Sequence, residues 1–432
     1  MDLDRLMWDV MERLVPTSRV FCSPDYDAAA EMLASLLAAR VRTYPAAQER
    51  NGWVIHPRWA VRAATISRDG KLLYDGRHHA LAVIALSRTF HGRVSREELR
   101  EHLHFDHRYP DALPYHFRQL YRPWDRDWGF CVPRRFYDGL EEGSYDVVIE
   151  TDEGPGDLKI VDAILPGRRP ETILFAAHLD HPGMANDDLA GCAVGVALMQ
   201  WLRARSRKFT YRLVLHPEVI GPEYFLPSLA PHERSLICDG LFLEMLGTET
   251  KLGLQRSLSG PDHLLARMEA YCREEGIAHR SGAYGEVVVN GEYVWESHGV
   301  SLASLSRYPY PEYHSSRDNL SIIAPRALSE SLAIVQAGVA ALESEPVLFK
   351  DFEGTLCLSN PAYDLYVDPG QLAFGGVADD ALRQGIRRCM ELLPTLRGPE
   401  PIRELSVRFG LPAEVLMDYL RRWEEKRLVA IL

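Results

Sequence analysis

One stretch, Thr172 to Gly191, constrains the fold more than any other part of the chain. It reads TILFAAHLDHPGMANDDLAG. Its first residues are apolar and predict a buried strand, and the Ala-, Gly- and Val-rich residues that follow it predict a helix. His178 and Asp187 lie in the connection, between the strand end and the helix start. Folding alone does not explain metal-ligand residue types in that place, so the stretch predicts half of a zinc site.

Strands and helices alternate along the chain after this stretch. The apolar runs YRLVLHP, LICDGLFLEML and VSLASLS predict further strands, and residues 260–276 and 324–342 predict helices. The alternation predicts an α/β fold, a three-layer sandwich around a mixed, mostly parallel sheet. In such sheets functional groups gather at the C-terminal ends of strands, and His178, Glu218 and Glu244 lie at or just beyond such ends.

The length of 432 residues exceeds one ordinary domain. Residues 1–43, which read as helical, and residues 125–365 predict the main domain. Residues 44–124 carry strand patterns and an Asp-Gly turn, and they predict a small β-rich domain inserted into the main one. Residues 376–432 show a short helix, a Gly turn, a longer helix and a terminal strand, which is the pattern of a winged helix.

The net charge of −12 and the seven cysteines narrow the function classes. A strongly negative chain has no general affinity for phosphate backbones or anionic membranes. The cysteines form no CxxC pair and are odd in number, which is typical of a reducing compartment. The N-terminus lacks the pattern of a signal peptide, and no uncharged apolar run reaches transmembrane length. We therefore expect a soluble cytoplasmic protein without a membrane partner.

The candidate metal ligands begin with His178 and Asp187. Asp180 would orient the imidazole of His178 as part of the catalytic machinery, and Asp187 would return to the same metal after a tight loop. Each residue also has a plain explanation, as a core histidine or as the N-cap of the following helix. The H-x-D and N-D-D patterns together favour the metal.

Two glutamates and a loop histidine extend the candidate site. Glu218 would act as the general base toward a zinc-activated water, and a salt-bridged loop carboxylate is an equal alternative. Glu244 lies within an apolar strand, where a carboxylate is costly to bury unless it is paired or binds a metal, so a ligand role is favoured. His314 lies in an aromatic loop, with Asp318 four residues on, and is a weak candidate by itself.

Taken together, the motifs HLD, NDD, PE, FLEMLG and YHSSRDNL resemble, in order and spacing, the zinc aminopeptidases of the leucyl aminopeptidase, glutamate carboxypeptidase and glutaminyl cyclase superfamily. The chain looks closest to a bacterial aminopeptidase-like branch with an inserted β domain and a C-terminal winged helix, and the similarity covers almost the whole chain. The resemblance implies four zinc ligands, which are His178, Asp187, Glu244 and His314. It also implies that Asp187 bridges two ions where two are present, that Glu218 is the base, and that Asp318 is the outer partner of His314.

One departure from the superfamily concerns the second metal. In the superfamily the base is usually followed directly by a second glutamate that binds this ion, whereas this chain has Val219. We therefore expect one secure zinc ion at His178 and Asp187, with a second in doubt. His181 would be an extra ligand, a substrate-binding residue or only a turn histidine. Glu292 would bind a substrate amine or be a solvated loop carboxylate.

The predicted function is a zinc-dependent, aminopeptidase-like hydrolase that acts on a small peptide or amide. The alternatives are an N-deacylase or glutaminyl-cyclase-like enzyme at a single zinc, and a non-catalytic regulatory protein that acts through the winged helix. The charges of residues 411–428 nearly cancel, which argues against nucleic acid and favours protein contacts or a homo-oligomer. The aromatic tract 109–128 would line a substrate pocket or, for most of it, form the core of the inserted domain.

Overall fold

The computed structural model describes residues 2–288, 290–367 and 380–432, and its centre is a mixed sheet of eight strands. In spatial order the strands are β1 (Arg40–Pro45), β10 (Asp157–Leu165), β12 (Thr210–His216), β11 (Thr172–His178), β13 (Ile237–Glu244), β16 (Ala303–Ser306), β14 (Leu252–Gln255) and β15 (His279–Gly282). The four strands from β12 to β16 run parallel, whereas β10 and β14 pair antiparallel with them. The predicted α/β class with a mixed sheet is confirmed.

The C-terminal ends of the four parallel strands meet along one edge of this sheet. The register pairs His178 with His216 and Glu244 with Ser306. The pairing of β11 with β13 brings Glu244 level with His178. Side chains at level positions of neighbouring strands point to the same face, so these four residues form one row at the edge.

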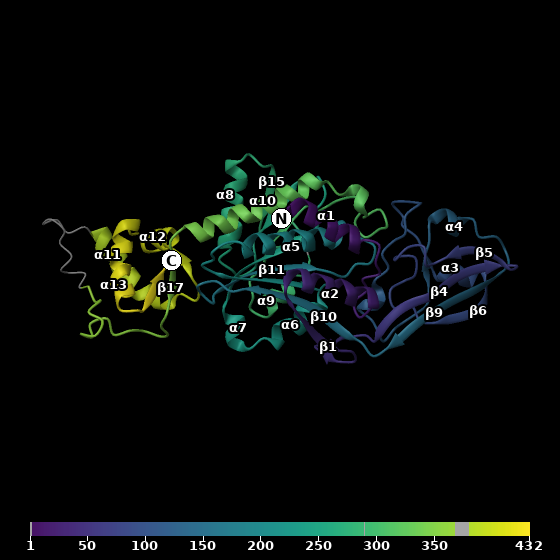
Figure 1. The fold of residues 1–432 in the computed structure, drawn as a ribbon, viewed down its shortest axis with the longest axis horizontal. Helices are drawn as coiled ribbons and strands as arrows, with labels where there is room; N and C mark the ends of the chain where they lie inside the picture. The colour runs from purple at the N-terminus through teal and green to yellow at the C-terminus, as the bar shows by residue number, and fades with distance from the viewer. Residues whose placement is uncertain (1, 289, 368–379) are drawn as a thin grey trace.

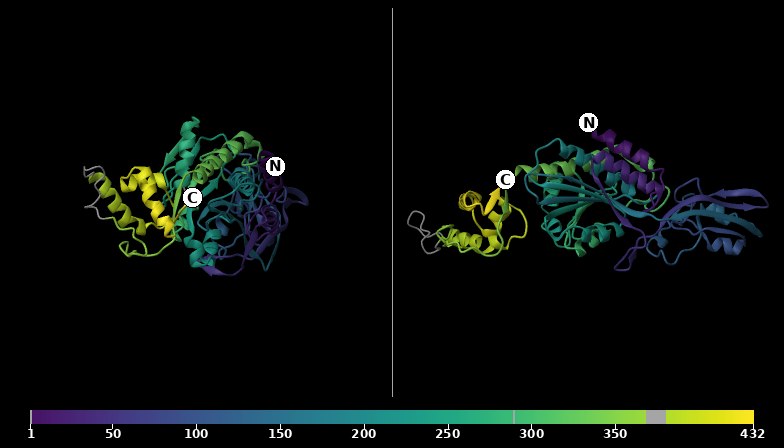
Figure 2. Two further views of the ribbon diagram at one scale, coloured as in Figure 1. Left: turned by 60° about the vertical axis from the view of Figure 1, so that its left-hand side comes forward. Right: turned by 60° about the horizontal axis from the view of Figure 1, so that its bottom comes forward.

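Helices cover both faces of the sheet (Figures 1 and 2). The helices on one face are α5 (Gly191–Arg203) and, around it, α1 (Leu3–Leu14), α2 (Pro24–Leu37), α8 (His263–Glu274) and α10 (Pro325–Ser344). The helices on the other face are α6 (Ile220–Ser228), α7 (Pro231–Ser235) and α9 (Glu292–Ser297). α5 is apolar almost all round because it is enclosed by the sheet and the outer helices. A Cβ at Gly191 would lie 2.2 Å from the carbonyl oxygen of Leu243, so only glycine lets α5 start this close to β13.

Residues 46–156, between β1 and β10, form an inserted part that projects from one end of the molecule (Figure 1). Its main sheet has the order β5-β4-β9-β6, formed by β4 (Arg58–Arg68), β5 (Lys71–Asp75), β6 (Phe90–Ser95) and β9 (Ser144–Gly154). The smaller elements are β2 (Glu49–Arg50), β3 (Trp53–Val54), α3 (Arg96–Glu101), β7 (Leu103–His104), η1 (Arg118–Leu120), β8 (Phe130–Cys131) and α4 (Arg134–Asp138). The predicted inserted domain, 44–124, leaves out β9, which pairs with both β4 and β6.

The C-terminal part lies at the opposite end (Figure 1). β17 (Val347–Lys350) pairs with β18 (Glu400–Pro401) and β19 (Val429–Ile431). The helical elements are α11 (Asp380–Leu392), η4 (Leu393–Thr395), α12 (Ile402–Phe409) and α13 (Ala413–Glu425), and they enclose a hydrophobic core of their own. The predicted order of helix, Gly turn, helix and strand is present, and its assignment as a winged helix stays a prediction. Residues 376–379 of that predicted domain lie outside the described residues.

Some local predictions are wrong. The sequence predicts helix to residue 43, but α2 ends at Leu37 and Arg40–Pro45 forms the edge strand β1, because its backbone pairs antiparallel with β10. The short strands β14 and β15 are not predicted, since four residues carry too little periodicity. Within the described ranges, no helix has both the length and the apolar character needed to cross a bilayer.

Candidate metal centre

Two histidines and one aspartate come together where β11 ends. His178 is the last residue of this strand, and His181 and Asp187 follow in the connection to α5. Nε2 of His178 lies 3.3 Å from Oδ1 of Asp187, and Nε2 of His181 lies 3.8 Å from its Oδ2. One ligand atom from each of the three residues lies within 4.8 Å of the other two. This spacing is compatible with ligands around a metal ion.

Several polar atoms of this cluster are buried without a hydrogen-bond partner. His178 is 1% exposed and His181 and Asp187 are 2% exposed. The unpartnered atoms are both ring nitrogens of His178, Nδ1 of His181 and Oδ2 of Asp187. Buried polar atoms are nearly always paired in native proteins, and an unpaired one costs about 1–3 kcal/mol. A cation bound between His178 and Asp187 would satisfy Nε2 of His178 and Oδ2 of Asp187, so these residues fit a metal.

The charges of the cluster shift its titration. Burial would raise the pKa of Asp187, but the imidazoles of His181, His314 and His178 hold it well below its ordinary value. Burial would lower the pKa of His181, but the carboxylates around it, Asp187 first, raise it to about 10. Burial and the neighbouring His181 lower the pKa of His178 to about 3. With these pKa values the imidazole of His178 is neutral near pH 7 and can bind a metal. The imidazole of His181 carries a proton that a metal would displace.

Two buried aspartates fix the backbone of the connection between β11 and α5. The carboxylate of Asp188 accepts three backbone hydrogen bonds, from the N–H groups of His178, Gly191 and Met245. The carboxylate of Asp318 accepts four, from the N–H groups of Ala185, Asn186 and Asp187 and from the hydroxyl of Tyr310. Asp318 therefore positions Asp187 through its backbone. Among the described residues, the side chain of Asp318 bonds to these backbone groups and to Tyr310. It does not bond to His314, the partner that the family resemblance implies.

Arg19 fixes the same connection from the N-terminal segment. Its guanidinium is fully buried and donates to the carbonyl oxygens of Leu179, His181 and Met184 at 3.0, 2.6 and 3.0 Å. His181 has a φ of +83°, which is uncommon for a residue with a side chain, and the bond to its carbonyl holds that conformation. Nothing in the sequence points to this role of Arg19, because the carbonyl groups that it binds in the connection lie 160 to 165 residues away.

Asp180 lies beside both imidazoles. Its Oδ1 is 3.8 Å from Nδ1 of His178 and 3.8 Å from Nδ1 of His181. The same oxygen accepts the N–H of Glu218 at 2.8 Å. This position is compatible with the predicted orienting role, and it also ties the connection after β11 to the segment that carries Glu218.

Glu218 follows β12 and lies beside the cluster. Its Oε2 is 3.6 Å from Nε2 of His181 and 3.3 Å from the hydroxyl of Tyr121. Burial, opposed by the charge of His181, raises the pKa of Glu218 to about 7. A carboxyl group with a pKa near neutrality can accept and release a proton at physiological pH, which a general base requires.

The residue after this glutamate, Val219, forms a strained turn. The N–H of Ile220 donates to the carbonyl of Glu218 at 2.6 Å, and Val219 has φ +60° and ψ −61°. This is a γ-turn of the rare, strained kind, and a β-branched residue is poorly suited to a positive φ. Strain of this kind costs about 1–3 kcal/mol and is typical of functional sites.

Glu244 ends β13 and is fully buried, with no hydrogen-bond partner for either carboxylate oxygen. Burial, and then the charge of Glu292, raises the pKa of Glu244 well above its ordinary value. Glu244 lies outside the group of three residues whose ligand atoms are mutually within 4.8 Å. Glu292 is buried at the start of α9 and accepts hydrogen bonds from Gln255 and Ser304. It is therefore not a solvated loop carboxylate, and its amine-binding role stays a prediction.

His314 approaches Asp187 from the other side. Its Nε2 lies 3.3 Å from Oδ2 of Asp187, and its ring stacks on Tyr313 with centroids 3.8 Å apart. The inserted part holds this loop, because the N–H of Tyr115 donates to the carbonyl of His314 at 3.0 Å. The structure thus brings the distant His314 to the same aspartate that His178 contacts.

A pocket of about 190 Å³ borders the cluster at His181. Its polar walls are Asp180, His181, Glu218 and His314, and its apolar walls are Phe21, Trp53, Tyr115, Phe117, Leu120, Tyr121, Ile220 and Tyr313. Five of these apolar residues belong to the inserted part. The aromatic tract 109–128 therefore has two roles, since Trp128 is core and stacks on Phe90 while Tyr115 and Tyr121 line the pocket.

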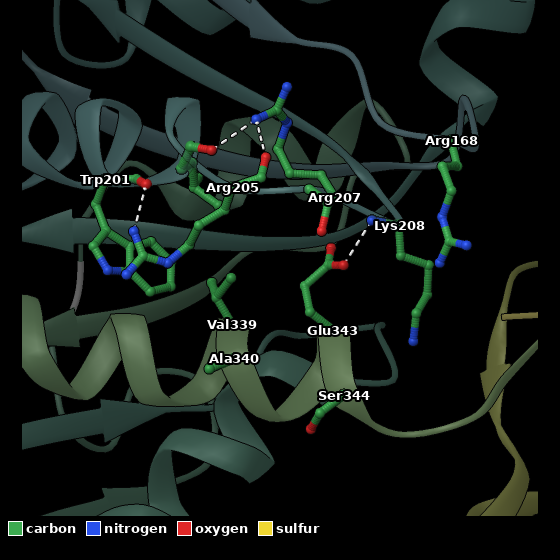
Figure 3. Close-up of a pocket in the computed structure, with 11 residues that line it drawn as sticks. Arg168, Trp201, Arg205, Arg207, Lys208, Val339, Ala340, Glu343 and Ser344 are labelled. Carbon is green, nitrogen blue, oxygen red and sulfur yellow. Dashed lines mark hydrogen bonds between the residues drawn. The ribbon is translucent and has the colours of Figure 1, made fainter.

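A larger pocket of about 370 Å³ lies where α5 and α10 end, and it is rich in basic residues (Figure 3). The guanidinium of Arg207 donates to the carbonyl of Leu202 at 2.7 Å, and Nζ of Lys208 donates to that of Leu342 at 3.0 Å. Cations at helix C-termini satisfy carbonyls that have no partner within the helix. These charges have a structural explanation, so the smaller pocket is the candidate site.

A second group of metal-ligand types, His263, Glu400 and Glu404, also lies within 4.8 Å. Here the carboxylates already have cationic partners. Glu404 lies 2.7 Å from Nδ1 of His263 and 2.5 Å from Arg267, and Glu400 lies 2.9 Å from Arg408. The group is an ion-pair network that joins α8 to the C-terminal part.

Comparisons with known proteins agree with this fold. A family model described as a domain of unknown function (DUF4910) matches residues 8–345. A Clostridium acetobutylicum protein, whose description names polysaccharide biosynthesis and an aminopeptidase-like domain, is 24% identical over 335 residues, or 75% of each chain. A crystal structure from the same organism, whose description names a peptidase, covers 99% of this chain and 96% of its own, with 20% identity and a TM-score of 0.76. A zinc aminopeptidase from Bacillus subtilis covers 78% of this chain and 95% of its own, with 13% identity and a TM-score of 0.55. The chain therefore has the fold of zinc aminopeptidases.

Proposed function

The chain belongs to the DUF4910 family, whose description assigns no activity, and from that premise we propose that it is a zinc-dependent hydrolase of a peptide-like amide bond. Its substrate would be a small peptide or amide that is cleaved near a free amino terminus. Buried, unpartnered ligand atoms lie beside a pocket whose wall includes a carboxyl group of raised pKa, and this arrangement supports the proposal.

His178 and Asp187 would hold the zinc ion, because their facing ligand atoms are buried and 3.3 Å apart. Glu244 is the candidate third ligand, since it lies level with His178 at the sheet edge and both of its oxygens lack partners. A zinc ion there would supply a Lewis acid that polarises the substrate carbonyl and activates water.

The remaining steps belong to the protein side chains. Glu218 would accept a proton from the attacking water on its carboxylate and deliver it to the leaving amine. Asp180 would orient the imidazoles of His178 and His181, and it would fix the position of Glu218 by accepting its N–H. The pocket, at about 190 Å³, is smaller than the roughly 300–1,000 Å³ of pockets for drug-sized ligands. It would therefore enclose one substrate end and exclude a continuing polypeptide.

The substitution Glu218→Gln tests this role. We expect the variant to keep its zinc content and its thermal unfolding temperature, and to lose hydrolysis by at least about 100-fold, since a general base contributes roughly that factor or more. Turnover is measured on a panel of aminoacyl amides, with zinc counted by metal analysis. N-acyl amino acids and peptides with N-terminal glutamine in the same panel distinguish a deacylase or a cyclase.

Glu274→Gln, on the exposed face of α8, is the matched control and should leave turnover unchanged. Full turnover in Glu218→Gln would refute the assignment of the base. A wild-type protein without bound zinc after supplementation would refute the proposed function and favour a non-catalytic binding protein.

A further inference from the structure

Trp53 reaches the pocket from a short hairpin rather than from a large sheet or a long helix. It is half-buried, whereas Phe21, Leu120 and Ile220, which also form apolar walls, are at most 7% exposed. The hairpin consists of β2 and β3, and in the described part of the chain these strands pair only with each other. A two-stranded hairpin by itself is marginally stable in water, so other contacts must fix the position of Trp53.

The turn of the hairpin provides one such contact. Asn51 has a φ of +50° and Gly52 a φ of +85°, which are the conformations that a two-residue Asn-Gly turn requires. The side-chain amide of Asn51 donates to Oε1 of Glu223 on α6 at 2.7 Å. Asn51 therefore both makes the turn and attaches it to the main domain.

Glu223 joins the hairpin to two helices. Its carboxylate is buried, and its Oε1 also lies 3.3 Å from Nε of Arg50. Its Oε2 lies 2.9 Å from Nε2 of His298, at the end of α9. A buried carboxylate is costly unless it is paired, so Asn51 and Arg50 of the hairpin supply part of a pairing that Glu223 needs.

The next residue of α6, Tyr224, holds the strands themselves. Its hydroxyl donates to the carbonyl oxygens of Gln48 and Trp53, at 2.9 and 2.8 Å. On the pocket side, the indole of Trp53 meets the ring of Tyr121 edge to face, with centroids 5.8 Å apart. The hydroxyl of Tyr121 lies 3.3 Å from Oε2 of Glu218. Trp53 is thus fixed on one side by α6 and faces the wall beside the candidate base on the other.

We infer that Trp53 limits the size of the substrate group that enters the pocket, and that Glu223 is the positioning residue that holds Trp53 in place. The inference rests on the proposed function, in which the pocket encloses one end of the substrate. The substrates it selects are amides whose enclosed end carries a small side chain. The competing explanation is that Trp53 only packs the inserted part against the main domain, in which case its removal would not change the order of preferred substrates.

Hydrogen exchange tests the role of Glu223 without an activity assay. In Glu223→Gln and in Asn51→Gly, which keeps a residue suited to a positive φ, we expect the amides of residues 49–54 to exchange several-fold faster at fixed pH. The amides of α5 should be unaffected. Glu274→Gln, on the exposed face of α8, is the matched control. Unchanged exchange of residues 49–54 in both variants would overturn the positioning role.

The substitution Trp53→Ala tests the size limit. Turnover is measured on the amides of alanine, leucine and tryptophan. We expect the ratio of kcat/KM for the tryptophan amide to that for the alanine amide to rise at least about 10-fold, since even one methylene in an apolar pocket is worth roughly that factor. Trp124→Ala is the matched control, because Trp124 belongs to the inserted part, is 66% exposed and does not line the pocket. Thermal unfolding establishes that each variant is folded.

The outcomes separate the inference from the proposed function. An unchanged ratio in Trp53→Ala, with turnover retained, would overturn the size limit and leave the proposed function intact. A wild-type protein that cleaves none of the amides would count against the proposed function and the size limit together, whereas the role of Glu223 is decided by hydrogen exchange alone.

Discussion

Tyr121 and Arg19 act on the candidate site from outside the motifs that define it. Tyr121 comes from the inserted part, and its hydroxyl lies 3.3 Å from Oε2 of Glu218. Arg19 comes from the segment after α1 and binds three carbonyl groups of the connection that carries His181. At the scale of single residues, the chemistry of the site thus depends on groups that the fold brings in from a distance.

The substitution Tyr121→Phe should move the pH dependence of turnover. The hydroxyl of Tyr121 helps to lower the pKa of Glu218, which burial raises to about 7. Without it the pKa of Glu218 rises further, so less of the base is ionised at neutral pH. We expect the acidic limb of the pH–rate profile to move to higher pH and kcat at pH 7 to fall several-fold, since about 1 kcal/mol is at stake in one hydrogen bond. Tyr366→Phe, at an exposed tyrosine of the C-terminal part, is the control, and an unmoved profile would count against the role of Tyr121.

Among the elements, the connection between β11 and α5 is the one whose shape matters most. It carries His181 and Asp187, and the buried carboxylates of Asp188 and Asp318 supply acceptors for its backbone N–H groups. The loop around His314 is held from outside in a similar way by the inserted part. The candidate ligands are therefore preorganised by hydrogen bonds to the backbone.

Asp318→Asn should loosen this connection. An amide keeps one acceptor oxygen but turns an NH₂ group toward donors, so we expect a loss of about 1–3 kcal/mol in the free energy of unfolding. Zinc affinity should fall by about 10- to 100-fold, as is usual when the partner of a ligand is removed. Chemical denaturation and zinc competition measure the two effects, with Asp111→Asn at an exposed aspartate as the control. Unchanged zinc affinity would show that Asp318 has no part in placing Asp187.

How much of the fold and of the candidate site could be predicted depends on how far apart in the sequence the contacting residues lie. The strand, His178 and Asp187 can be recognised in the sequence because the buried strand and the two candidate ligands lie within one short stretch of the chain. His314 is a weak candidate by itself, and only the order of the motifs indicates it. Its predicted partner, Asp318, binds the backbone of Asp187 instead. The contacts of Arg19 and Tyr121 and the γ-turn at Val219 leave no local pattern, so the sequence could not predict them. The helix predicted to residue 43 is wrong at β1, because pairing with β10, rather than periodicity, decides the conformation of this strand.

For the whole molecule, the main domain is joined at one end to the inserted part and at the other to the C-terminal part (Figure 1). The joint to the inserted part is also a wall of the pocket, because Trp53, Tyr115 and Tyr121 belong to it. The joint to the C-terminal part is the ion-pair network of His263, Glu404 and their neighbours. The joint to the inserted part therefore shapes the pocket, whereas the joint to the C-terminal part holds that part against α8.

Docking of the C-terminal part should depend on pH. Burial lowers the pKa of His263, but its hydrogen bond to Glu404 and the surrounding carboxylates raise it above the ordinary value of about 6.5 overall. Burial raises the pKa of Glu404, but His263 and Arg267 lower it to about 2. Protonated His263 therefore stabilises the joint fully below about pH 6.5, and that contribution is lost as the pH rises through the raised pKa. The contribution of Glu404 is lost only in acid, as the pH falls from about 4.5 toward 2.

We accordingly expect limited proteolysis of α12 to increase, and its hydrogen-exchange protection factors (rates corrected for the intrinsic pH dependence of exchange) to decrease, between pH 6 and pH 9 in the wild type. His263→Gln should remove this difference, and His91→Gln should preserve it. Equal protection of α12 at both pH values in the wild type would contradict the prediction.

The bonds from Arg19 to residues 179–184 also set an order of events during synthesis. The first helices leave the ribosome early, but the carbonyl groups that Arg19 binds are made 160 to 165 residues later. All of the inserted part is made in between, and β4, β5, β6 and β9 need only one another to complete their sheet. Contacts between distant segments form late because closing a long loop costs entropy. The segment that carries Arg19 is therefore made before its partners, and the connection between β11 and α5 takes its final shape only after the inserted sheet can already have folded.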